Sequence, residues 1–333
     1  MAQTPTYVVV GPQEHGVTRH ALALAGAGDA VVRRLPAHPT VDALLAAADG
    51  AGAVHLHLTD HLLAGSPAAA ADLVEALADR CRTTLTLHDV PQPAEGAERY
   101  ARRARAYGRM RRAAAVCVVA SEHEREALER CGDSDTPIEV VPLPVERSVH
   151  RPAGASAETP FAVAVLGFVY PGKGHLDVLA AMRDLPAEVG LDVLGAPSPG
   201  HDGLLDELAA GAAEQGRRLR VTGYVDDADL AGELTRPVVP VLAHRHASAS
   251  GSAATWIGHG RRPVALDGGY ARELAARYPW AVTVVDDLAA GMAAALSGEV
   301  STWIDPGDGR TAVVDTAEAA RLEALAVGER ALA

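Results

Sequence analysis

Apolar and polar positions form alternating blocks along this chain. Short apolar runs, of the length of a strand buried on both faces, are followed by alanine-rich segments with helical spacing. Strands are predicted in the first part of the chain at 7–10, 30–35, 53–58, 83–87, 115–119 and 138–141. Helices are predicted at 18–25, with Thr18 as N-cap, and around 41–48, 67–80, 97–112 and 121–131. This alternation predicts a parallel, doubly wound sheet with helices on both faces.

The rhythm breaks near residue 142, where prolines and a polar stretch form a linker over 143–158, and it resumes at Phe161. Strands are then predicted at 161–166, 191–194, 218–221, 238–242, 263–266 and 281–284. Helices are predicted around 174–184, 203–214, 227–234, 251–259, 270–277 and 287–297. The sequence therefore predicts two Rossmann-like α/β domains, 1–145 and 160–310. A helix at 311–333 follows and could pack back on the first domain.

Composition narrows the class of protein. The 333 residues are 48% hydrophobic and 22% charged, which is typical of a globular protein, and no apolar run is long enough to cross a bilayer. The first residues lack the basic and apolar regions of a signal peptide, so we expect a cytoplasmic protein, with peripheral membrane contact still possible. The net charge of −13 disfavours nucleic-acid binding. The three cysteines form no C-x-x-C pair and are expected to be reduced thiols.

The stretch from Phe161 to Met182 has the pattern of a phosphate-binding loop. A buried strand is followed by the glycine-punctuated loop 167–174 and then by helical spacing. Lys173, in that loop, is the only lysine among 30 basic residues. Loop amides, a helix N-terminus and an ammonium group all favour an anion, and glycine lets the backbone approach it. A solvated lysine in an ordinary turn is the alternative.

Two further loops of the second half carry polar groups at predicted strand ends. The loop 222–227 could bind a nucleobase through the backbone of Tyr224 and Val225. In the hydroxyl-rich segment 244–256, Ser250, Gly251 and Ser252 could cap a helix and offer amides and hydroxyls to a diphosphate. Helix capping alone would explain one serine but not the cluster.

In the first half, candidate groups also follow strands. Gly16, just before a helix, would let amides meet an anion or a sugar. His88 and Asp89 end a strand where the binding crevice is expected, although they could simply cap a turn. His55 and His57 share one face of a strand. They are expected to point outward while the leucines between them point inward, and the pair could suggest a metal site. Neutral buried imidazoles are the commoner outcome, and no metal site is predicted.

Taken in order, these motifs resemble the retaining family 4 glycosyltransferases of the GT-B fold, of an actinobacterial type. In the second half the resemblance rests on Gly167-Phe-Val-Tyr-Pro-Gly-Lys-Gly-His175, Leu194-Gly195, Gly223-Tyr-Val-Asp226 and Gly260-Arg-Arg-Pro-Val264. In the first half it rests on His15-Gly-Val-Thr-Arg-His20, Thr86-Leu-His88, Ala120-Ser-Glu122 and Pro142-Leu-Pro144. It covers roughly residues 7–300.

The resemblance implies two domains facing across a cleft, the first binding an acceptor and the second a nucleotide-sugar donor. It implies a metal-independent hexosyltransferase without a cofactor, whose donor is a UDP- or GDP-type nucleotide sugar and whose acceptor is a small molecule or glycan. The linker 143–158 would act as a hinge.

The resemblance supplies the reaction type, and the physical properties of the loops supply the roles of residues in it. His88 and Lys173 would be catalytic, and His15, Asp60 and Asp89 would lie on the acceptor side. The donor would be bound by Gly16, Gly167, Gly172, Gly174, Tyr224, Val225, Ser250, Gly251, Ser252 and Thr255.

The chain departs from the family pattern at two places. Phe168 stands where an arginine is usual, and the segment 248–256 has no acidic residue where the family carries two glutamates. A non-catalytic nucleotide-sugar binder or partner subunit is therefore one alternative, and a GT-B sugar-nucleotide epimerase is another. A nicotinamide dehydrogenase is disfavoured because no G-x-G-x-x-G follows the first strand of either half. The sequence specifies neither the acceptor, the nucleotide nor the oligomeric state.

Overall fold

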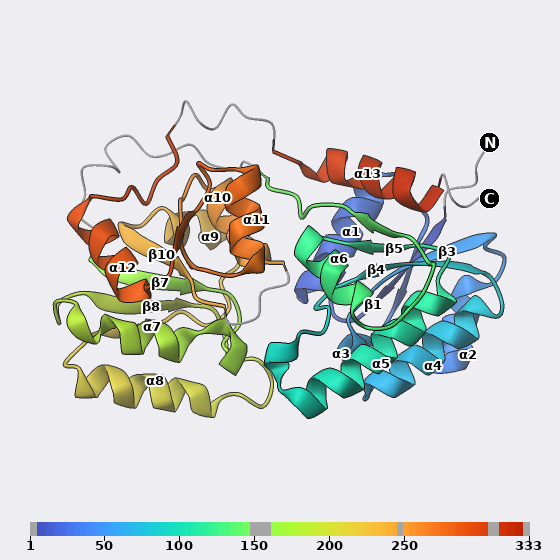
Figure 1. Cartoon of the computed structure of the whole chain (residues 1–333), viewed down its shortest axis with the longest axis horizontal. Coiled ribbons are helices and arrows are strands. Elements are labelled where there is room, and N and C mark those ends of the chain that lie inside the picture. Colours follow the sequence, from blue (N-terminus) through green and yellow to red (C-terminus); the bar gives the residue numbers. More distant parts are fainter. Residues whose placement is uncertain (1–4, 147–160, 245–248, 306–312, 329–333) are drawn as a thin grey trace. The chain divides into compact units, whose positions relative to one another are not determined.

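The computed structural model describes residues 5–146, 161–244, 249–305 and 313–328. The chain divides into two compact units (Figure 1). One unit comprises Met1–Pro144 together with Val314–Ala333, and the other comprises Val145–Val313. Each holds a six-stranded parallel sheet flanked by helices, which confirms the predicted fold class. Most of the predicted hinge lies outside the described residues.

The first unit is built on the sheet order β2-β1-β3-β4-β5-β6. Its strands are β1 (Thr6–Val10), β2 (Val32–Leu35), β3 (Ala53–Leu58), β4 (Arg82–Leu87), β5 (Cys117–Val119) and β6 (Ile138–Val140). Its helices are α1 (Gly16–Ala27), α2 (Val41–Ala48), α3 (Asp60–Leu63), α4 (Pro67–Ala78), α5 (Ala97–Ala113), α6 (Glu122–Glu129) and α13 (Thr316–Gly328). The short α3 and the 3-10 turn η1 (Pro93–Glu95) were not predicted.

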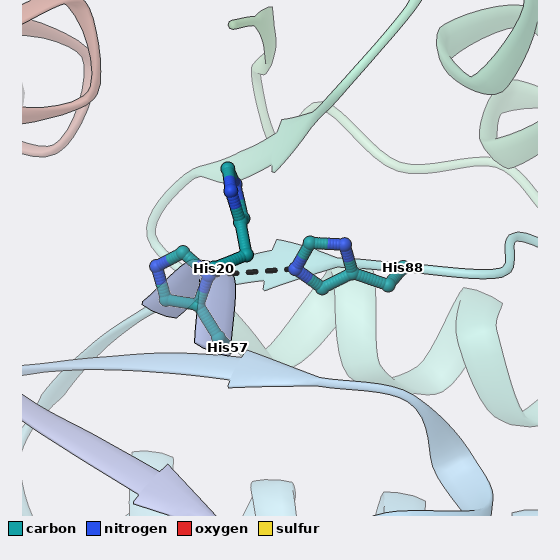
Figure 2. A group of neighbouring side chains, drawn as sticks. All are labelled: His20, His57 and His88. Atoms are coloured by element: carbon teal, nitrogen blue, oxygen red, sulfur yellow. Dashed lines mark hydrogen bonds between the residues drawn. The ribbon is translucent and has the colours of Figure 1, made fainter. Parts of the chain in front are cut away.

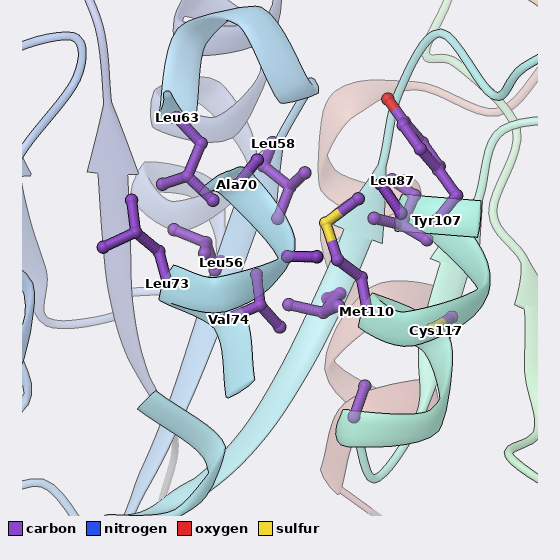
Figure 3. Close-up of a cluster of buried hydrophobic side chains, with 14 of the residues drawn as sticks. Leu56, Leu58, Leu63, Ala70, Leu73, Val74, Leu87, Tyr107, Met110 and Cys117 are labelled. Carbon is purple, nitrogen blue, oxygen red and sulfur yellow. The ribbon is translucent and has the colours of Figure 1, made fainter. Parts of the chain in front are cut away.

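The larger core of this unit lies on one face of the sheet. Figure 3 shows Leu56 and Leu58 of β3 meeting Val74 of α4 and Met110 of α5. All four are buried, and each such side chain stabilises the fold by about 1.5–3 kcal/mol. The opposite face is covered by α1 and α13, which pack against each other. The predicted return of the C-terminal helix to the first unit is thereby confirmed.

The second unit has the sheet order β12-β11-β10-β7-β8-β9. Its strands are β7 (Ala162–Leu166), β8 (Gly190–Leu194), β9 (Leu219–Val221), β10 (Val238–Leu242), β11 (Val264–Leu266) and β12 (Thr283–Val285). Its helices are α7 (His175–Ala181), α8 (Gly203–Glu214), α9 (Asp227–Leu234), α10 (Gly251–Gly258), α11 (Gly269–Arg277) and α12 (Leu288–Ser297), with 3-10 turns η2 (Pro171–Lys173) and η3 (Met182–Asp184). Apolar side chains are buried on both faces of the sheet, as the continuous apolar runs predicted.

Two local predictions were wrong. α1 begins at Gly16 with His15 as its N-cap, so Thr18 lies inside the helix. The Thr18 hydroxyl instead donates to the carbonyl of Val10, 3.1 Å away, and ties the helix to β1. His55 and His57 do alternate with leucines, but they do not face outward, because α1 and α13 cover that face and both histidines are buried.

No helix in the described parts of the chain combines the length and the apolar character that a membrane span requires.

Candidate functional site

Each sheet has one point at which the order of its strands reverses direction. In the first sheet β1 lies between β2 and β3, and in the second β7 lies between β8 and β10. Ligands of doubly wound folds bind beyond the carboxyl ends of the strands at such a point. His57 and His88 lie on the β3 and β4 side of the first point, and Lys173 follows β7 at the second.

In the first unit, strand register brings polar side chains together on one face. Tyr7 of β1 lies beside His55 of β3, which in turn lies beside Thr84 of β4. His57 is likewise in register with Thr86. Residues in register on parallel strands share a face, so these side chains form a compact polar group in front of α13.

Glu323 of α13 enters this group and is 0% exposed. Its carboxylate accepts hydrogen bonds from the Tyr7 hydroxyl at 3.0 Å and from the Thr86 hydroxyl at 2.7 Å. The Nε2 atom of His57 is 3.3 Å away. Burial alone would raise the pKa of Glu323, but the adjacent His57 and His55 hold it well below its usual range. The group is therefore built around a buried negative charge.

The carboxylate determines which ring nitrogens carry protons along a chain of two histidines. A carboxylate only accepts hydrogen bonds, so a neutral His57 has its proton on Nε2 and a bare Nδ1. The Nε2 atom of His88 lies 3.4 Å from that Nδ1 and is therefore the donor of this long hydrogen bond. His88 is left with Nδ1 as a hydrogen-bond acceptor.

His20 of α1 completes a set of three imidazoles with His57 and His88 (Figure 2). Its ring centroid lies 5.7 Å from that of His57 and 5.5 Å from that of His88. Burial, followed by the nearby His57, lowers the pKa of His20 to about 4. Burial, followed by His20 and His57, lowers the pKa of His88 well below its usual value. The rings of His20 and His88 are therefore neutral at physiological pH.

The predicted acceptor-side residues differ in their surroundings. Asp60 is buried in an ion pair with Arg103, whose guanidinium nitrogens lie 3.0 and 3.1 Å from its two carboxylate oxygens. Asp89 has a left-handed backbone with φ of 51°, and its carbonyl also accepts from Arg103. The Nδ1 atom of His15 accepts from the first turn of α1, while the Gly16 position opens onto free space. Asp60 is thus occupied by a structural contact, whereas a side chain at Gly16 would meet only open space.

In the second unit, Lys173 is 6% exposed and is not a solvated lysine. Its Nζ donates to the Ser252 hydroxyl at 2.9 Å. No carboxylate of the described residues forms an ion pair with it. Burial without such a partner lowers the pKa of Lys173 to about 7. Lys173 is thus a buried amine with no acidic partner among the described residues, and a bound anion would favour its protonated form.

The serines beside Lys173 lie at the start of α10. Ser250 is the N-cap of α10, and its hydroxyl accepts from the amide of Ala253 at 3.2 Å. It also lies 3.0 Å from the Ser252 hydroxyl. Gly251 and Ser252 occupy the first turn, where amides have no partner within the helix. Thr255, one turn on, donates to the carbonyl of Gly251. Lys173, Ser252 and Ser250 form one connected polar group.

The glycines of this loop hold the backbone close to its neighbours. Gly174 has φ of +85°, and a Cβ there would lie 2.1 Å from the Ala243 carbonyl oxygen. Gly167 has φ of +108°, and its Cβ would lie 3.0 Å from the Lys173 Nζ. Gly172, in η2, is limited only by the Tyr170 ring. The backbone conformation and close packing at Gly167 and Gly174 therefore require glycine. The same close packing of the loop keeps Lys173 buried.

Two histidines near Lys173 were not singled out from the sequence. His175 is 3% exposed, and neither of its ring nitrogens has a hydrogen-bond partner among the described residues. Burial, then Lys173, lowers the pKa of His175 to about 3. Burial, then Lys173 and His175, lowers the pKa of His244 well below its usual value. His175 follows the Lys173-Gly174 pair directly, which was the available signal.

Two other predicted donor residues lie farther along the same sheet. Tyr224, 49% exposed, and Val225 are in the loop after β9, which is separated from β7 by β8. In the first unit the residue missed from the sequence is Glu323. Glu323 is spaced from Ala320 and Val327 so that it lies in the apolar stripe of α13. A single charged residue in such a stripe indicates that it has a polar partner in the core.

Solved structures resemble this chain over nearly its whole length. HepE of Anabaena in complex with UDP and glucose matches with a TM-score of 0.73 and 14% identity, covering 97% of this chain and 94% of that chain. The chain has the GT-B fold. Sucrose-phosphate synthase of Thermosynechococcus elongatus matches with a TM-score of 0.67 and 17% identity, covering 99% and 97% of the two chains. The lipopolysaccharide outer core galactosyltransferase WaaB matches with a TM-score of 0.68 and 10% identity, covering 98% and 100%.

No family model and no curated protein matches the sequence.

Proposed function

We propose that this protein transfers a hexosyl group from a nucleoside diphosphate sugar to an acceptor, with retention of the anomeric configuration. The observation that carries the proposal is the buried Lys173 at the strand-reversal point of the second unit, which lacks an anionic partner among the described residues. A buried cation is stabilised by an anion, and a diphosphate supplies one in the right position for the first-turn amides of α10. The structural neighbour HepE contains UDP and glucose, which supports this class of donor.

The chemistry follows from where charge develops. As the bond to the sugar breaks, negative charge grows on the leaving diphosphate, and groups fixed in advance around it lower the barrier. Lys173, the amides of Gly251 and Ser252 and the Ser252 hydroxyl are such groups in this proposal. They provide the charge stabilisation without a metal ion at the diphosphate.

His88 is the proposed substrate contact of the first unit. With Nε2 donating to His57, its Nδ1 accepts a hydrogen bond from a sugar hydroxyl. Gly16 offers open backbone at the start of α1 for the donor or acceptor.

Ligand-induced stabilisation tests the proposal. The full-length protein would be heated with UDP, GDP and other nucleoside diphosphates, and with their sugar conjugates. We expect one nucleotide to raise the melting temperature of the wild type but not of Lys173→Ala, because binding stabilises the folded state by mass action.

Release of nucleotide from the matching conjugate in the presence of acceptors would then establish transfer. Binding of a conjugate without turnover would identify a nucleotide-sugar binder instead, and release of nucleotide without any acceptor would identify an epimerase or hydrolase. The absence of any response to a nucleoside diphosphate would refute the proposal.

A further inference from the structure

We propose that His20, His57 and His88 bind a divalent transition-metal ion, with Zn²⁺ as the reference ion. The three residues come from α1, β3 and the loop after β4, and their nearest ligand atoms all lie within 4.8 Å of one another. The proposal concerns the first unit alone and does not depend on the proposed transfer reaction.

The spacing of the rings fits a three-imidazole site. Zinc–nitrogen bonds of about 2.0–2.1 Å in a tetrahedron place ligand nitrogens about 3.3 Å apart. The Nδ1 of His57 and the Nε2 of His88 are 3.4 Å apart. The three ring centroids are separated by 5.5, 5.6 and 5.7 Å, close to the roughly 5.2–5.5 Å of rings arranged around one tetrahedral or trigonal ion.

His20 provides a second reason. Its ring nitrogens have no hydrogen-bond partner among the described residues, although its neighbours His57 and His88 are bonded to each other. A neutral imidazole with a free nitrogen, facing two others, is the donor set that zinc, copper and nickel prefer.

The surroundings of His57 supply what a metal-bound histidine usually has. Histidine ligands commonly donate their second ring N–H to a carboxylate, which fixes the ring and raises its basicity. His57 does so through Nε2 to Glu323, leaving Nδ1 for the ion. The Glu323 carboxylate is itself held by Tyr7 and Thr86, so the ring is oriented by a rigid frame.

Charge balance supports a cation at this place. The side chains bonded or ion-paired to Glu323 are those of Tyr7, Thr86, His55 and His57, and none of these is permanently positive. Buried charges in proteins are paired or coordinate metals. A divalent ion on the far side of His57 would offset the Glu323 charge through the ring.

A bound ion would change what His88 offers to a ligand. With Nε2 bonded to the metal, the neutral His88 ring carries its proton on Nδ1, which then donates a hydrogen bond instead of accepting one. Three imidazoles leave a fourth coordination position open, as in catalytic zinc sites.

The test uses the full-length protein without an affinity tag, stripped of metal by a chelator. Zn²⁺ binding would be measured by calorimetry, and Co²⁺ binding by the visible absorption of the cobalt ion, which reports its coordination number. We expect one ion per chain and the absorption of four-coordinate cobalt. His20→Asn, which removes one of the three imidazoles, should weaken binding at least about 100-fold. Glu323→Gln should weaken it about 10–100-fold, because it loosens His57 without removing a ligand.

His201→Asn, which removes a histidine of the second unit, is the matched control and should bind the metal as the wild type does. The proposal fails if the wild type binds no more tightly than His20→Asn, or if cobalt remains six-coordinate. It also fails if Glu323→Gln abolishes binding while His20→Asn preserves it. That result would place the ion among His55, His57 and Glu323, the other group of adjacent ligand atoms.

Discussion

The two units share one fold, and among the described residues each holds a buried ionisable side chain without a permanently charged partner, acidic in the first unit and basic in the second. In the first unit, beside the reversal point of the sheet, Glu323 is a buried anion surrounded by neutral or weakly basic groups. In the second, in the turn after β7, Lys173 is a buried amine bonded to a neutral hydroxyl. Other buried charges are satisfied within the protein: Arg261 donates to carbonyls of Leu234 and Thr302. This difference is the reason for proposing an anion beside Lys173 and a cation beside the histidines of the first unit.

The largest expected effect comes from removing the cation. Lys173→Ala should lower kcat/KM for sugar transfer about 10²–10³-fold, because a group that stabilises the leaving diphosphate is lost. Steady-state kinetics with the nucleotide sugar identified by the stabilisation screen would measure it.

Arg183→Ala is its matched control, since it removes an exposed positive charge nearby in the same unit. If the two variants transfer sugar at the same rate, Lys173 is not the charge that the reaction uses.

Removing the anion should mainly affect the stability of the first unit. Glu323→Ala leaves the buried hydroxyl of Tyr7 and the His57 ring without their partner, and should cost about 3 kcal/mol. Hydrogen exchange of the β3 amides, followed by mass spectrometry, would report the loss.

Glu318→Ala, on the same helix but exposed and paired only at the surface, should change stability by less than about 0.5 kcal/mol. Equal effects of the two substitutions would show that the buried carboxylate contributes nothing particular to the histidine group.

The pH dependence of nucleotide binding should reflect the lowered pKa of Lys173. The free protein loses the Lys173 proton near pH 7, whereas the diphosphate binds the protonated form. Affinity should therefore be constant below about pH 7 and fall by up to tenfold per pH unit above it. Calorimetry in two buffers of different ionisation enthalpy would detect the accompanying proton uptake at pH 8. The affinity of Lys173→Ala should lack this decline, and a wild-type affinity unchanged between pH 7 and 9 would contradict the account.

The smallest effect on stability is expected at Gly16. A Cβ there meets no atom within 4 Å, so Gly16→Ala should change stability by less than about 0.5 kcal/mol. Gly174→Ala is the comparison, because its Cβ would collide with the Ala243 carbonyl and should destabilise the second unit strongly. Thermal unfolding measures both. A large loss of stability in Gly16→Ala would show that this glycine serves the fold and is not kept for a ligand.

Much of the fold could be predicted because the apolar runs in the sequence coincide with the strands of the two sheets. Segments such as 53–58 and 238–242 were predicted with their observed bounds, since a short apolar run between turns has few other stable arrangements. The start of α1 was misplaced because Thr18, a good N-cap by type, uses its hydroxyl to bind β1 instead.

The candidate sites were less accessible to sequence reasoning. The loop around Lys173 was visible because its residues are contiguous. Only part of the histidine group could be predicted. His57 and His88 lie at the ends of strands, but Glu323 comes from a helix far along the chain. His20 belongs to a helix face that the sequence alone does not orient toward β3. The burial of Lys173 excludes the solvated lysine that the sequence left as the alternative.

The return of α13 to the first unit has a consequence for how the protein is synthesised. The first sheet emerges from the ribosome long before Glu323, and the whole second unit is made in between. During that interval the histidines of β3 lack their carboxylate, and α1 lacks the helix that covers it. The second unit is contiguous in sequence and can finish folding first. The first unit is thus translated first but completed last. Until α13 is made, the apolar face of its sheet that α13 covers is exposed, and a chaperone would be expected to bind there.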